Sequence, residues 1–77
     1  MHPMIVSLDG RTFKFTLQDH RGEQFVYMLE GEMEYVVGDK VYTVREEDSL
    51  YFDARVLHGP KIRKSQKARY LVVFSQP

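Results

Sequence analysis

The chain has no cysteine and no tryptophan, and its 11 basic residues are balanced by 11 acidic ones. Without cysteine, neither a disulfide nor a thiolate metal site is available. A net charge of zero gives no general attraction to nucleic acid or to a membrane surface. No apolar run approaches the roughly 20 residues that span a bilayer. We therefore expect a cytoplasmic protein that acts on no membrane and does not itself bind nucleic acid.

Helical periodicity is also missing from every stretch of ten or more residues. The sequence instead contains short apolar segments separated by turn residues, which is typical of strands in an all-β fold. The predicted strands cover residues 4–8, 12–17, 24–29, 33–37, 41–44, 50–52 and 70–74. Their tight turns favour antiparallel neighbours, and the longest loop spans residues 53–66. We expect one domain over residues 1–77, a small antiparallel β-barrel or jelly roll.

The segment 24–29 is the most strongly β-prone part of the chain and is apolar on both faces. Alternation places Val26 and Met28 on one face, and Phe25, Tyr27 and Leu29 on the other. A strand with two apolar faces must be covered on both sides. A barrel of this size leaves little to cover the second face, so we expect a homodimer.

Two of the three histidines stand at the ends of predicted strands, while His2 lies close to the first residue. His20 precedes the segment 24–29, and His58 lies in the long loop after the segment 50–52. If the strands close into one barrel, both imidazoles reach the same mouth and form a metal or substrate site. The alternative is that each is a polar residue at a loop edge.

These residues fall in two stretches that resemble the motifs of the cupin superfamily, the small barrels also called double-stranded β-helices. The first motif has the form His-x-His, three or four residues, Glu, six residues, Gly; here Gln18-Asp19-His20 leads through Gln24 to Gly31. The second has the form Gly-Asp, four residues, Pro-x-Gly-x-x-His; here residues 47–58 have the same length and end in His58. The wording is most similar to the C-terminal cupin domain of helix-turn-helix transcription regulators.

In metal-binding cupins, three histidines and a glutamate hold the ion. The resemblance implies that Gln18, His20, Gln24 and His58 stand at these positions, so two ligands have become glutamine. A site without an anionic ligand gains less Coulomb energy from a divalent cation. We expect at most a weakly bound Zn, Fe, Mn or Ni ion at His20 and His58. Glu23 is a poor substitute ligand, because one step along a strand reverses the side chain, unless a bulge intervenes.

The same four polar residues predict a pocket for a small molecule that the sequence does not identify. The predicted lining of this pocket consists of Gln18, His20, Gln24, His58, Val26, Met28, Tyr35, Tyr51 and Phe52. A mostly apolar cavity with a few convergent hydrogen-bonding groups is typical of small-ligand sites. The alternative is an interior that is filled by methionine and aromatic side chains.

Three functions are compatible with these observations. The first is a ligand-sensing domain of a transcription regulator, whose DNA-binding part is not in this sequence. The second is a metal-dependent enzyme of the isomerase or dioxygenase type, which the two lost ligands argue against because such chemistry needs a retained ion with an open position. The third is a structural dimerisation module.

Overall fold

The computed structural model describes residues 2–75 and is built from β-strands and turns alone. The strands are β1 (His2–Asp9), β2 (Glu23–Gly31), β3 (Met33–Val37), β4 (Lys40–Val44), β5 (Ser49–Asp53), β6 (His58–Lys61) and β7 (Lys67–Phe74). They form a four-stranded antiparallel sheet in the order β1-β7-β2-β5 and a three-stranded antiparallel sheet in the order β4-β3-β6. No helix among these residues is long and apolar enough to cross a membrane.

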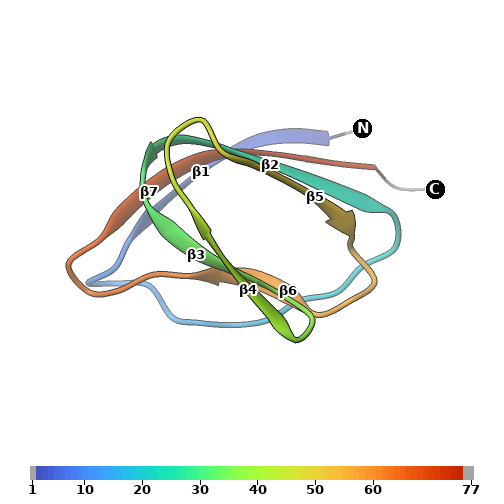
Figure 1. Cartoon of the computed structure of the whole chain (residues 1–77), viewed down its shortest axis with the longest axis horizontal. Helices are drawn as coiled ribbons and strands as arrows, with labels where there is room; N and C mark the ends of the chain where they lie inside the picture. Colours follow the sequence, from blue (N-terminus) through green and yellow to red (C-terminus); the bar gives the residue numbers. More distant parts are fainter. Residues whose placement is uncertain (1, 76–77) are drawn as a thin grey trace.

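The two sheets face each other and enclose the interior of a small barrel (Figure 1). The four-stranded sheet forms one wall, and β3, β4 and β6 lie opposite it. The all-β prediction is confirmed: the chain is a small antiparallel barrel of the jelly-roll type.

Strand alternation decides what faces the interior, as the sequence predicts for β2. Gln24, Val26 and Met28 are buried, while Phe25, Tyr27 and Leu29 are only half-buried on the outer face. Residues directly opposite each other on neighbouring strands share a face, so the register extends this pattern across the sheet.

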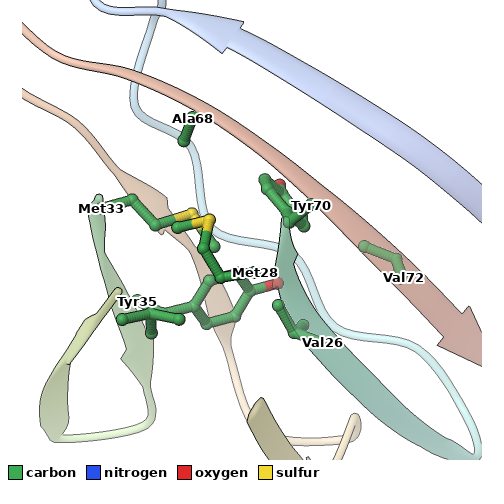
Figure 2. Close-up of a cluster of buried hydrophobic side chains, with 8 residues drawn as sticks. Val26, Met28, Met33, Tyr35, Ala68, Tyr70 and Val72 are labelled. Carbon is green, nitrogen blue, oxygen red and sulfur yellow. The ribbon is translucent and has the colours of Figure 1, made fainter. Parts of the chain in front are cut away.

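The core fills one end of the barrel. Met28 and Met33 are fully buried there and approach each other, with Tyr35 and Tyr70 packed beside them (Figure 2). Methionine side chains are flexible enough to fill such irregular space. The filled interior that the sequence allowed is therefore real at this end of the barrel only.

The predicted strand over residues 12–17 is wrong, and the structure has a strand at residues 58–61 that was not predicted. Residues 13–17 belong to no strand, and Phe15 and Leu17 are exposed despite their alternating pattern. The long loop predicted over 53–66 instead contains β6, which pairs with β3. The alternation of 12–17 therefore does not reflect the two faces of a sheet.

The segment 13–18 lies against β6, and this close approach depends on Gly59. A Cβ atom built on Gly59 would lie 2.5 Å from the carbonyl oxygen of Thr16 and 3.7 Å from Cα of Leu17. Real Cβ atoms do not come so near an oxygen, so only glycine allows the two backbones to meet here. The contact brings the segment that leads to His20 onto the strand that begins with His58.

Candidate functional site

Four backbone hydrogen bonds fix the segment 18–22 against the β5–β6 region. The amide of Gln18 donates to the carbonyl oxygen of His58, and the amide of His58 donates back to Gln18, each at 2.8 Å. The amide of His20 donates to Ala54 at 2.9 Å, and the amide of Ala54 donates to Gly22 at 3.0 Å. Residues 32 to 40 positions apart in the chain are thereby held side by side.

Gly22 then turns the chain into β2. Its φ of 102° lies in the region that favours glycine, and a Cβ atom there would lie 2.0 Å from the carbonyl oxygen of Ser75. This turn places His20 beside Gln24 on the inner side of the barrel. Glu23, between them, is exposed and accepts a hydrogen bond from the hydroxyl of Tyr51.

A hydrogen-bonded chain runs through His20, Gln24 and Tyr35. Nε2 of His20 lies 3.0 Å from Oε1 of Gln24, and Nε2 of Gln24 donates to the Tyr35 hydroxyl at 2.9 Å. Nδ1 of His20 lies 3.2 Å from the carbonyl oxygen of Arg21. Carbonyl oxygens only accept hydrogen bonds, so both ring nitrogens of His20 face acceptors. A neutral ring carries only one N–H proton, so in that form only one of these two contacts is a hydrogen bond.

Tyr35 and Tyr70 are kept protonated by burial. Tyr35 is 2% exposed, and burial raises its pKa to about 12, against a smaller opposite effect of the Gln24 hydrogen bond. Burial also raises the pKa of Tyr70, and the neighbouring Tyr35 adds to this effect. The two rings meet edge to face with centroids 6.5 Å apart. Both hydroxyls therefore carry their protons at neutral pH.

His58 has a different environment from His20. It is 3% exposed, and its Nδ1 donates to the carbonyl oxygen of Val56 at 2.8 Å. In the neutral ring this leaves Nε2 with a lone pair and no proton. The ring centroid lies 5.2 Å from that of His20 and 5.0 Å from that of Phe52. The two imidazoles thus meet at the same site, and Nε2 of His58 has no hydrogen-bond partner among the described residues.

A cavity of about 590 Å³ opens beside these groups. This volume lies within the range of pockets that hold drug-sized ligands. The polar side chains of its lining come mainly from the segment 13–20, β2, β3 and β6, and the apolar ones mainly from β1 and β7. The lining consists of Met4, Val6, Leu8, Phe13, Thr16, Gln18, His20, Gln24, Tyr35, His58, Gly59, Pro60, Tyr70, Val72 and Phe74. Among the described residues, no aspartate, glutamate, lysine or arginine lines it.

The structure brings five of the predicted pocket residues to this cavity and places four elsewhere. Gln18, His20, Gln24, Tyr35 and His58 line it. Val26 and Met28 do not, because they are sealed in the core with 0% exposure.

The two predicted residues of β5 also lie away from the cavity. Tyr51 points to the outer face and is 67% exposed, because Leu50 and Phe52 take the inward positions of this strand. Phe52 is half-buried against the core and lies behind the His58 ring.

Most of the apolar wall was missed by sequence reasoning. Val6, Leu8 and Val72 share the inner face of β1 and β7, and Phe13 reaches the cavity from a segment without regular structure. The alternation within residues 4–8 and 70–74 carries a usable signal for the first three. No periodic pattern marks Phe13, because its position depends on the crossing at Gly59.

The donor set does not fit a firmly held divalent ion. Within residues 2–75, no three histidine, cysteine, aspartate or glutamate side chains gather closely enough to hold a metal ion. His20 and Gln24 satisfy each other, so an ion would have to break their hydrogen bond before binding. Zinc in proteins is held by three or four good ligands, and here His58 alone offers a free one.

The chain belongs to the cupin family, because the cupin domain matches residues 4–74. No match was found among curated proteins.

Solved structures share the fold. A cupin protein from Bacteroides fragilis superposes with a TM-score of 0.83 and 12% identity over 96% of this chain and 64% of the other. Hydroxypropylphosphonic acid epoxidase from S. wedmorenis, in complex with fosfomycin, superposes with a TM-score of 0.80 and 22% identity over 95% of this chain and 42% of that one. A CoII form of HppE in complex with substrate superposes with a TM-score of 0.80 and 24% identity over 95% of this chain and 43% of that one. This chain therefore spans less than half the length of the epoxidase.

Proposed function

We propose that this cupin domain binds a small organic molecule in the cavity beside His58 and acts as a ligand-sensing domain of a transcription regulator. The observation that carries the proposal is a cavity of about 590 Å³ whose lining combines apolar side chains with a few hydrogen-bonding ones. In such sites, a small number of precisely placed polar groups on an apolar surface orient the ligand. In such a regulator, contact with DNA falls to another part of the protein.

A ligand screen read out by thermal unfolding tests this proposal. We expect bound compounds to raise the melting temperature of the wild-type protein, because binding only to the folded state stabilises it. Val72 lines the cavity, so Val72→Phe should abolish the increase. Val41 is 54% exposed on β4 and away from the cavity, so Val41→Phe is the matched control and should keep it.

Chemical shifts of the amides of Thr16 and His58 provide a second measurement that does not depend on the stability of the variants. Compounds that stabilise the protein should move these resonances in the wild type. Equal stabilisation of Val72→Phe by the same compounds, with no shift at these two amides, would contradict the proposal.

A weakly bound divalent ion is a second candidate for the same site. The supporting observation is the 5.2 Å separation of the His20 and His58 ring centroids. We propose that Zn, Fe, Mn or Ni binds there only when Gln24 releases His20, and is lost on dialysis into metal-free buffer. Elemental analysis of the dialysed protein tests this; one retained equivalent of any of the four metals would show a firm metal site instead.

We also propose that the protein forms a homodimer through the outer face of the four-stranded sheet. One cross-strand row on this face consists of Pro3, Val73, Phe25 and Tyr51, and the next contains Ile5, Leu71 and Tyr27. Ile5 and Tyr51 are 50% and 67% exposed. Strand β1 stands at the sheet edge, where its unpaired backbone groups can take a second β1 in antiparallel fashion. A second copy would cover both features at once.

A further inference from the structure

Two polar atoms of nearly fully buried residues at the cavity have no hydrogen-bond partner within the described chain. They are Nε2 of His58 and the hydroxyl of Tyr70, both in residues that are 3% exposed. Among residues 2–75, every buried side-chain nitrogen or oxygen that is closed off from solvent has a hydrogen-bond partner. Nε2 of His58 and the Tyr70 hydroxyl have none, so both atoms are accessible from the cavity that their residues line. Leaving buried polar groups without partners costs stability, so such a pair indicates a place for a ligand.

The chemical role of each atom follows from its neighbours. The Nδ1 proton of His58 is committed to Val56, so Nε2 of the neutral ring accepts. The Tyr70 hydroxyl keeps its proton because burial raises its pKa, so it donates. A hydroxyl group both donates and accepts, so it has the chemistry to pair with either atom.

The rest of the lining limits the charge and polarity of the ligand. An anion bound away from water needs a cationic partner, and a cation needs a carboxylate. The described lining contains no lysine, arginine or carboxylate, and its side chains from β1 and β7 are mainly apolar. A phosphonic acid, such as the one that names the epoxidase, would find no lysine or arginine here.

We propose that the ligand is an uncharged, mainly apolar alcohol or phenol whose hydroxyl donates to Nε2 of His58 and accepts from the Tyr70 hydroxyl. This inference rests on the proposed function of the cavity and adds the chemical class of its ligand. It also assigns a role to Tyr70, which the sequence did not indicate.

Three matched probes test the class: 4-fluorophenol, 4-fluoroanisole and 4-fluorobenzoate, with affinities measured by fluorine NMR titration. We expect 4-fluorophenol to bind about fivefold to tenfold more tightly than 4-fluoroanisole, since one net hydrogen bond contributes about 1 kcal/mol. The anionic 4-fluorobenzoate should bind more weakly than either.

Tyr70→Phe removes only the hydroxyl, and Tyr42→Phe makes the same change on β4, outside the cavity lining. Tyr70→Phe should lower the affinity for 4-fluorophenol about fivefold, and that for 4-fluoroanisole in the same direction, since the oxygen of each probe can accept from this hydroxyl. Tyr42→Phe should change neither. The preference for phenol over anisole is a ratio within one protein, so it is unaffected by a loss of stability in the variant.

The outcomes separate the two proposals. Equal binding of phenol and anisole, tighter binding of benzoate, or an unchanged phenol affinity in Tyr70→Phe would overturn the ligand class while leaving the cavity as a binding site. If no probe shifts the amides of Thr16 or His58 at millimolar concentration, the proposed function fails as well.

Discussion

At the scale of single residues, the site depends on Gln24, which occupies a position where the resemblance to metal-binding cupins implies a metal ligand. Gln24 bridges His20 and Tyr35 through its two polar atoms and fixes the orientation of both side chains. A carboxylate at this position would only accept, and it would place a charge beside two tyrosine rings. The amide therefore gives the cavity a neutral, hydrogen-bonded lining at this position.

Replacing Gln24 by Met tests this bridge. The change keeps the length of the side chain and removes both hydrogen bonds, leaving the buried Tyr35 hydroxyl without its donor. We expect the free energy of unfolding to fall by about 1–3 kcal/mol in urea denaturation. The double variant Gln24→Met, Tyr35→Phe should recover part of the loss, because removing both partners is cheaper than removing one. No recovery in the double variant would contradict the bridge.

The raised pKa of Tyr35 leads us to predict a loss of stability at high pH. Its folded-state pKa is raised from 10.0 to about 12, so between these values the folded state holds the proton and the unfolded state releases it. The free energy of unfolding should therefore fall by up to about 1.4 kcal/mol per pH unit from this group as the pH rises. Denaturation at several pH values between 9 and 11.5 checks this. In Tyr35→Phe the fall should be shallower, and an identical slope would refute the assignment.

At the scale of the elements, the strands that bury apolar side chains were predictable and the one held by backbone contacts was not. Residues 33–37 were predicted with their observed bounds, because Met33 and Tyr35 alternate with half-buried positions. β6 has the sequence His-Gly-Pro-Lys, which has no β-prone pattern, and it exists because β3 pairs with it.

The same distinction applies to the site. The convergence of His20 and His58 followed from motif spacing, which depends on chain length between strands. Which residues of β5 face the interior was not predicted correctly. Tyr51 and Phe52 were both assigned to the pocket, although alternation along a strand allows only one of them to point inward. The hydrogen bond between Gln24 and Tyr35 could not be read from sequence, because it depends on how the two sheets face each other.

The crossing of the segment 13–18 over β6 predicts the effect of Gly59→Ala. The added methyl group would lie 2.5 Å from the Thr16 carbonyl oxygen, so one backbone must move. We expect a loss of about 1–3 kcal/mol and faster hydrogen exchange at the amides of Gln18 and His58. Gly38→Ala is the control, since its methyl group meets no atom within 4 Å and only its φ of +62° is strained. It should leave these two amides protected; equal protection in both variants would argue against a tight crossing.

At the scale of the whole molecule, the outer face of the four-stranded sheet decides whether the protein is a dimer. Leu71 lies in the centre of its apolar rows, between Ile5 and Tyr27. We expect Leu71→Glu to convert a dimer into a monomer, measured by sedimentation velocity at micromolar concentration, because a buried unpaired carboxylate is costly. Val41→Glu on the other sheet should leave the dimer intact. A monomeric wild-type protein, or dissociation by Val41→Glu, would contradict this interface.

The register between β1 and β7 has a consequence for biosynthesis. In the described part of the chain, the segment that leaves the ribosome first pairs only with the segment that leaves last. The larger sheet therefore cannot be completed during translation of these residues, and its closure is a slow, non-local event of the kind that raises contact order. Until then the Met4–Leu8 stretch lacks its partner strand, and its exposed backbone edge and apolar side chains are open to association with other chains.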